Sequence, residues 1–205
     1  MKSDIFPIAE IDEKRIQELG CTIKEGEIAV IPTDTIYGIV GSALNQKTVE
    51  KIYKLRKRNS SKPMIILIDS QSQILDLGIK LSDDQFKTLF NLWPSPLSIV
   101  VDVNSQKLSY LHRGNNSLAL RMPANEFLLK FLKVSGPIVA PSANFEGEAA
   151  ALTQKDAENY FKDNVAFYID GGELNSKPST VAKLEGDKLK VLREGAAKIP
   201  KQFLK

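Results

Sequence analysis

The sequence predicts an α/β fold in one domain, residues 1–205, with a mixed sheet and flanking helices. Short apolar runs alternate with amphipathic segments along most of the chain, and this order is typical of sheets that are covered by helices. No linker rich in Pro, Gly or Ser divides the 205 residues, and no internal repeat is present. A content of 42% hydrophobic and 26% charged residues is ordinary for a chain that buries a substantial core.

Helix signals occur in five segments. In the first, Ile16, Leu19 and Ile23 recur at three- and four-residue steps, which places them on one helical face. The other four segments begin with a residue that can cap a helix, and the one at Ser82 has a capping-box pattern with Gln85. The expected helices are 12–24, 46–56, 82–92, 125–134 and 153–161.

Strand signals are apolar runs that end at proline, glycine or polar residues. The expected strands are 27–31, 64–68, 97–103, 118–121, 138–140, 166–169, 180–184 and 188–192. Pro32 ends the first of them because proline cannot donate to a sheet ladder. We therefore interpret residues 33–41, which contain two glycines, as a loop or turn, and 104–116 as a loop with a short helical turn.

Composition excludes several classes of site. One cysteine and one histidine rule out an internal disulfide, a cysteine-based zinc site and a multi-histidine metal site. The net charge of +3 permits an anionic substrate or RNA without requiring either. The longest aliphatic run, 64–68, is far shorter than the ~20 residues of a membrane helix, and no apolar signal core begins the chain. We expect a cytoplasmic protein without a membrane partner.

A cluster of cations follows the second expected helix. The chain has neither a Gly-x-x-x-x-Gly-Lys-Ser/Thr loop nor a Gly-x-Gly-x-x-Gly motif, so a bound nucleotide would need side chains for its phosphates. Arg56, Arg58 and Lys62 could supply them, because arginine forks onto phosphate oxygens. The alternative is a solvated charge run after a helix, and composition alone favours it.

Small polar residues recur where strands end. Open α/β sheets bind ligands at such places, although each group could equally form an ordinary turn with local hydrogen bonds. Their recurrence favours one shared site, because strand ends on one edge converge in space. These residues are Thr33, Asp34, Thr35, Tyr37, Ser142, Asn144, Ser179, Thr180 and Arg193.

Eight motifs together resemble one family, the YrdC-like threonylcarbamoyl-AMP synthases in their single-domain form. They occur in the family's order and span about residues 27–196. The motifs are Pro32-Thr33-Asp34-Thr35-Ile36-Tyr37-Gly38, Arg56-Lys57-Arg58 with Lys62-Pro63-Met64, Trp93-Pro94-Ser95-Pro96-Leu97-Ser98, Leu120-Arg121-Met122-Pro123, Gly136-Pro137-Ile138-Val139-Ala140-Pro141-Ser142-Ala143-Asn144, Asp170-Gly171-Gly172, Pro178-Ser179-Thr180-Val181 and Leu192-Arg193-Glu194-Gly195-Ala196.

The resemblance implies a twisted sheet around a large, positively charged cavity. It implies that L-threonine, bicarbonate and ATP give threonylcarbamoyl-AMP and pyrophosphate, with Mg²⁺ bound to ATP. Other proteins would then use the product to modify an adenosine next to the tRNA anticodon, and a weak RNA contact by this chain fits the same role.

The resemblance also assigns residues to roles. The catalytic set is Arg56, Arg58, Ser142 and Asn144. ATP would contact Arg58, Lys62, Ser117, Ser142 and Arg193. L-Threonine would contact Thr35, Arg121, the backbone of Ala140 and Ser179, and Thr33 and Tyr37 would wall the pocket. No protein ligand for a metal ion is assigned.

The chain departs from the family pattern at six positions. Arg56 stands where the family often has lysine, which keeps the charge. Lys57 and Asn59 replace glycine and proline, Ser95 replaces glycine, Leu67 replaces a histidine of longer members, and Ala150 replaces a serine.

Two other functions stay open from sequence. One is an RNA-binding or ribosome-maturation module on the same fold, against which the aromatic content of 7% argues, because single-strand recognition relies on aromatic stacking. The other is a carbamoyl-transfer enzyme, which a single cysteine disfavours.

Overall fold

One mixed sheet of ten strands forms the centre of the protein, and its spatial order differs strongly from the order along the chain. The computed structural model describes residues 2–205. Across the sheet the order is β1-β8-β2-β3-β7-β4-β6-β5-β9-β10. The strands are β1 (Asp4–Pro7), β2 (Ile28–Ile31), β3 (Gly38–Ser42), β4 (Ile65–Leu67), β5 (Leu97–Asp102), β6 (Ser117–Arg121), β7 (Ile138–Val139), β8 (Phe167–Asp170), β9 (Thr180–Glu185) and β10 (Lys188–Arg193).

The five predicted helices are confirmed, and their caps form as expected. Asn45 Oδ1 accepts hydrogen bonds from the backbone N–H groups of Lys47 and Thr48. Complete capping boxes begin the helices after Ser82 and Thr153. The helices are α1 (Glu13–Lys24), α2 (Gln46–Leu55), α3 (Gln71–Asp76), α4 (Asp83–Leu92), α5 (Ser109–His112), α6 (Glu126–Ser135) and α7 (Gln154–Phe161), with 3-10 turns at Ile8–Glu10, Gln106–Leu108, Lys162–Asn164 and Lys201–Phe203.

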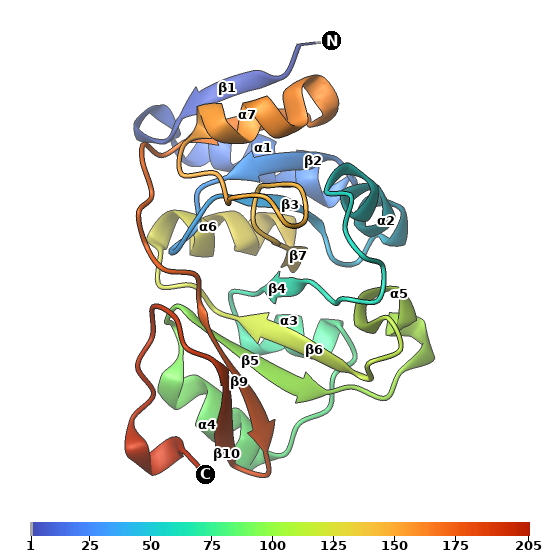
Figure 1. The fold of residues 1–205 in the computed structure, drawn as a ribbon, viewed down its shortest axis with the longest axis vertical. Coiled ribbons are helices and arrows are strands. Elements are labelled where there is room, and N and C mark those ends of the chain that lie inside the picture. The colour runs from blue at the N-terminus through green and yellow to red at the C-terminus, as the bar shows by residue number, and fades with distance from the viewer. Residues whose placement is uncertain (1) are drawn as a thin grey trace.

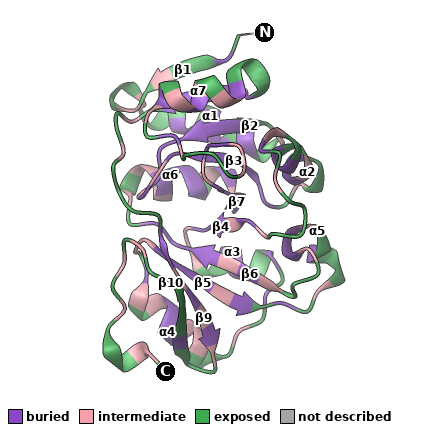
Figure 2. Cartoon of the chain, viewed as in Figure 1, coloured by how far each residue is buried: buried purple, intermediate pink, exposed green. Residues whose placement is uncertain are grey.

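The pleat of the strands divides the core between the two faces of the sheet. Alternate side chains of a strand point to opposite faces, so Ala29 and Ile31 of β2 pack with α1 and α6. Ile28 and Val30 pack on the other face, with α2 and α7. Both faces are therefore covered, and the central strands are buried along their whole length (Figure 2).

The interpretation of residues 33–41 as one loop was wrong. Gly38–Ser42 is a fully buried strand that pairs antiparallel with β2, Ile31 opposite Gly38. Its second glycine, Gly41, serves close packing: a Cβ there would collide with the Thr48 side chain of α2. The sequence also gave no signal for β1 or α3, which are short and carry no clear hydrophobic period.

Antiparallel pairing brings four chain segments to one edge of the central strands. Because β2–β3, β3–β7 and β7–β4 are all antiparallel, the end of β2, the start of β3, the end of β7 and the start of β4 lie together. The start of β9 meets the start of β5, and the end of β10 meets the start of β9. Figure 1 shows β1 and α7 at one end of the molecule and the β9–β10 hairpin at the other.

Candidate functional site

A cavity of about 280 Å³ lies where these strand ends meet. Of the thirteen residues that the sequence assigned to the site, eleven line this cavity. The eleven are Thr33, Thr35, Tyr37, Arg56, Arg58, Arg121, Ala140, Ser142, Asn144, Ser179 and Arg193. Segments up to 160 positions apart in the chain therefore converge, as the recurrence of polar groups at strand ends predicted.

Lys62 and Ser117 do not line this cavity. Lys62 Nζ forms an ion pair with Glu146 Oε1 at 2.6 Å. Ser117 begins β6, where it pairs with Asp102 of β5. The ATP contacts assigned to both residues stay predictions.

Arg56 is the buried centre of the catalytic set. Its side chain follows α2 and is anchored on the loop after β7: Nε donates to the Asn144 carbonyl oxygen at 3.1 Å, and Nη2 donates to Asn144 Oδ1 and Ser142 Oγ, each at 3.1 Å. Burial, with a smaller effect of the Arg58 charge, lowers the pKa of Arg56 to about 10, so it stays cationic at neutral pH. Its Nη1 is buried and has no hydrogen-bond partner, which leaves donors for a ligand.

The cation cluster is not a uniform solvated run. Arg56 is 2% exposed, whereas Arg58 folds back on its own loop and donates from Nη2 to the Pro63 carbonyl at 2.9 Å. Lys57 points its ammonium at the Phe145 ring, 4.1 Å from its centre. Lys57 also has a φ of 50°, a left-handed conformation that glycine adopts without cost, so the turn persists although lysine occupies it.

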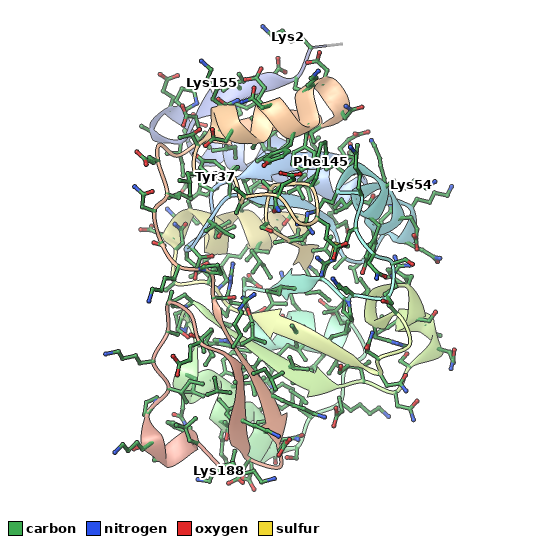
Figure 3. The ribbon with its side chains drawn as sticks, viewed as in Figure 1. Lys2, Tyr37, Lys54, Phe145, Lys155 and Lys188 are labelled. Carbon is green, nitrogen blue, oxygen red and sulfur yellow. The ribbon has the colours of Figure 1, made fainter. Side chains whose placement is uncertain are left out.

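Residues of the loop after β2 form a local turn and also line the cavity, so the two interpretations left open by the sequence both hold. Thr33 Oγ1 donates to the Ile36 carbonyl at 2.6 Å and accepts from two backbone N–H groups, as a local turn does. The Thr35 hydroxyl lies 3.1 Å from it and lines the cavity. Tyr37 is fully buried, and its hydroxyl donates to the Gly172 carbonyl at 2.7 Å; burial raises the pKa of Tyr37. Figure 3 shows Tyr37 and Phe145 below α7.

Two further arginines come from the other half of the sheet. Arg193 Nη2 donates to the Ser179 carbonyl at 2.8 Å, and Ser179 Oγ contacts Ser98 Oγ at 2.9 Å. Arg121 Nη2 lies 3.2 Å from Asp34 Oδ1, and both side chains are 4% exposed. Sequence reasoning noted Asp34 at the strand end but gave it no role in the site.

The remaining lining residues are mostly apolar members of the same motifs. Glu148 is the one carboxylate in the lining. Ala150 also lines the cavity, so its departure from the family's serine changes the wall itself. Leu67 is fully buried within β4 and lies outside the lining, and Ser95 Oγ donates to the Leu92 carbonyl.

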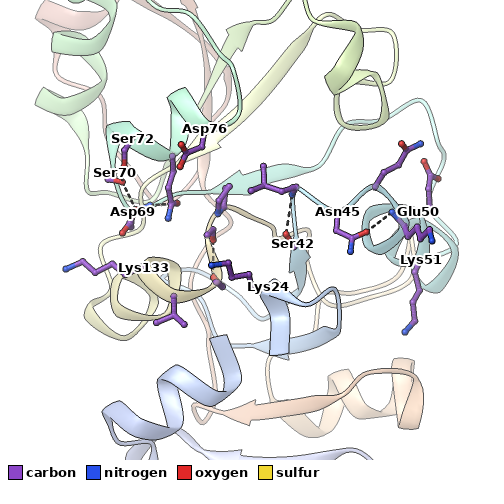
Figure 4. A pocket seen from close by; sticks show the side chains of 18 of the residues that line it. Lys24, Ser42, Asn45, Glu50, Lys51, Asp69, Ser70, Ser72, Asp76 and Lys133 are labelled. Atoms are coloured by element: carbon purple, nitrogen blue, oxygen red, sulfur yellow. Dashed lines mark hydrogen bonds between the residues drawn. The ribbon is translucent and has the colours of Figure 1, made fainter. Parts of the chain in front are cut away.

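A larger groove, of about 1430 Å³, lies at the opposite ends of the same central strands. Its walls include Ser42 at the end of β3, Asp69 after β4 and Pro137 before β7. Figure 4 shows that lysines and serines dominate its visible side chains. None of the residues assigned from the sequence lines it, so the smaller cavity is the candidate site on chemical grounds.

Two further properties concern residues 2–205, their capacity to bind a metal ion and to span a membrane. In this range no three His, Cys, Asp or Glu side chains form a group that could hold a metal ion. None of the helices there combines the length and apolarity needed to cross a bilayer.

Comparison with known proteins shows the family to which this chain is similar. The Sua5/YciO/YrdC family model, described as "Telomere recombination", matches residues 21–195. The threonylcarbamoyl-AMP synthase of Pyrococcus abyssi is 32% identical over 164 residues, 80% of this chain and 48% of that protein. A relative from Methanocaldococcus jannaschii is 30% identical over 206 residues, 98% of this chain and 97% of that protein.

A solved structure agrees with the fold. The crystal structure of P. abyssi Sua5 complexed with L-threonine superposes with a TM-score of 0.83 at 30% identity, covering 95% of this chain and 58% of that one. The chain thus spans about half the length of the P. abyssi relative. The chain belongs to the Sua5/YciO/YrdC family.

Proposed function

We propose that this protein is an L-threonylcarbamoyladenylate synthase, a nucleotidyltransferase that forms threonylcarbamoyl-AMP and pyrophosphate from L-threonine, bicarbonate and ATP. The observation that carries the proposal is the convergence of four arginines with serine and threonine hydroxyls on one cavity in a member of this family. The name of the P. abyssi relative and the L-threonine in its Sua5 structure support it.

The chemistry requires cations and positioning rather than an enzyme nucleophile. The threonine amine attacks bicarbonate carbon, and loss of water leaves a carbamate. A carbamate oxygen then attacks the α-phosphorus of ATP, and the bond to pyrophosphate breaks. Both reactants are anions, so bringing them together needs fixed positive groups that also stabilise charge on the leaving phosphates.

We assign these tasks to particular side chains of the lining. Arg56, Arg58 and Arg193 face the cavity and suit the phosphates, since guanidinium groups form charge-assisted hydrogen bonds to phosphate oxygens. Arg121 suits the threonine carboxylate, because a planar fork matches a carboxylate. Ser142 and Asn144 hold Arg56 in place.

Magnesium would enter with the nucleotide. Mg²⁺ is commonly held by one or two carboxylates together with substrate phosphates and water. We expect the phosphates of ATP to carry the ion into the cavity. Its chemistry would be to neutralise charge on those phosphates.

Pyrophosphate release tests the proposal. Purified protein is incubated with ATP, bicarbonate and Mg²⁺, with and without L-threonine, and we expect release only with threonine. Arg58→Ala should abolish the release while leaving the melting temperature within about 3 °C, because this half-buried side chain donates to two carbonyls of its own loop. No release from a folded protein that binds RNA would support the binding-module alternative.

That alternative makes a second, separable prediction. RNA held through many phosphates dissociates steeply as salt rises, whereas adenylate formation inside a cavity depends on salt much less. We also propose, with the synthase function, that tRNA-modifying proteins in the cytoplasm consume the product.

A further inference from the structure

Arg121 is a buried cation with most of its donors unused. It lines the cavity at the end of β6, and the whole residue is 3% exposed. Its one polar side-chain contact among the described residues is the ion pair with Asp34, and its Nε is buried without a hydrogen-bond partner. Buried polar groups without partners are rare and costly, so these donors point to a ligand.

Asp34 lies behind this arginine. The carboxylate follows β2, is itself 4% exposed, and is not among the residues that line the cavity. Its Oδ2 accepts from the Ala124 N–H at 3.3 Å, while Oδ1 faces Arg121 Nη2. One oxygen is thus fixed by the backbone just beyond β6, and the other forms an ion pair with the guanidinium that does not meet hydrogen-bond geometry.

The pair also sets the local charge. Burial lowers the pKa of Arg121, the Asp34 charge raises it again, and the nearby Arg193 charge lowers it by a smaller amount. Without Asp34, two adjacent guanidinium groups would present two positive charges, which favour a multiply charged phosphate. With Asp34, Arg121 is neutralised and still offers donors, which suits a single carboxylate.

We propose that Asp34 is a positioning and specificity residue: it holds Arg121 by Nη2, leaves the Nε edge free for the carboxylate of the amino-acid substrate, and disfavours phosphate there. This inference rests on the proposed function. It defines two regions of the cavity by charge, with phosphates excluded from the Arg121 end.

The test uses Asp34→Asn, which preserves size and removes the charge. The control is Asp84→Asn, an equal change of charge at an exposed side chain that pairs with Lys87 at 3.0 Å. We expect Asp34→Asn to raise the KM for L-threonine at least tenfold with the KM for ATP changed less than threefold. Added pyrophosphate should become a competitive inhibitor against threonine in this variant, and the control should match the wild type.

Asp34→Glu keeps the charge at a slightly longer reach, so its KM for threonine should lie between those of the wild type and Asp34→Asn. It also serves if Asp34→Asn does not fold. A KM for threonine within twofold of the wild type in a folded Asp34→Asn, or a loss of kcat with unchanged KM, would overturn the inference.

Threonine binding without ATP separates this inference from the proposed function. Calorimetry on the wild type should detect L-threonine, and Asp34→Asn should bind it at least tenfold more weakly. If the wild type binds threonine but releases no pyrophosphate, the synthase proposal fails. The role of Asp34 in carboxylate binding is then decided by whether Asp34→Asn binds threonine more weakly. If the wild type binds no threonine, both fail together.

Discussion

Replacing Asn144 by alanine should damage both stability and activity, and the structure gives the size of the first effect. Asn144 is 6% exposed. Its Oδ1 accepts from Arg56, and its Nδ2 donates to the carbonyls of Phe145 and Glu148 at 2.7 and 2.8 Å. A hydrogen bond to a charged group contributes about 1.5–3 kcal/mol and a neutral one about 0.5–1.5 kcal/mol. The three losses together predict a fall of about 2.5–6 kcal/mol in unfolding free energy.

Ser142→Ala is the matched comparison. Ser142 is half-buried and makes one bond to Arg56, whose Nη2 keeps Asn144 Oδ1 as an acceptor. Because solvent reaches this bond and Nη2 keeps that acceptor, we expect a loss at the lower end of the range for charged bonds, about 1.5 kcal/mol. For a chain of this size 1 kcal/mol corresponds to about 2–4 °C in melting temperature, so Asn144→Ala should melt about 10 °C lower and Ser142→Ala about 3 °C lower.

Differential scanning calorimetry and threonine-dependent pyrophosphate release measure the two effects on the same samples. At a temperature where each variant is folded, its rate of pyrophosphate release should be at least tenfold lower than that of the wild type, because Asn144 and Ser142 both hold Arg56. A melting temperature of Asn144→Ala within 3 °C of the wild type would refute the reasoning, since it would mean that these buried bonds contribute little. Full activity of a folded Asn144→Ala would remove the site assignment instead.

Three further outcomes are expected. Gly195→Ala should lower the unfolding free energy by about 1–3 kcal/mol, because the added Cβ would collide with the backbone carbonyl of Pro178, which cannot rotate away. Urea denaturation measures this loss, and a stability equal to that of the wild type would contradict it. Burial raises the pKa of Asp34 although the Arg121 charge lowers it, so the KM for threonine should rise as pH falls toward that pKa in the wild type and less in Asp34→Asn. Arg121 is the charged side chain that acts on Asp34, and equal profiles would refute the link. EDTA should stop pyrophosphate release and excess Mg²⁺ restore it, and release that survives EDTA would contradict the Mg²⁺ proposal.

Local signals in the sequence were sufficient for the helices and most strands. Asn45, Ser82 and Thr153 begin their helices with the side-chain caps that their residue types predict. These signals act within a few residues, so a single sequence contains them. The same holds for Pro32, which ends β2 as expected.

Long-range pairing could not be predicted in this way. Residues 38–42 form a strand because β2 and β7 lie on either side of them. From sequence alone their glycines are typical of a turn, and only the packing of α2 against Gly41 explains the second glycine. Likewise, β8 pairs with both β1 and β2 across more than 130 positions of chain. The partner of Arg121 was missed for the same reason: Asp34 is 87 positions away, and only the folded sheet makes them neighbours.

The anchors of the four cavity arginines divide the site by charge. Arg56, Arg58 and Arg193 are each held by neutral oxygens, mainly backbone carbonyls, so their orientation is fixed while their full charge faces the cavity. Among these four, Arg121 is the one paired with a carboxylate, Asp34, which offsets its charge. Donors that are already oriented need no reorganisation when anionic groups arrive. Three charged arginines therefore suit ATP phosphates, and the neutralised one suits a carboxylate, so the two anionic substrates can be sorted before any bond forms.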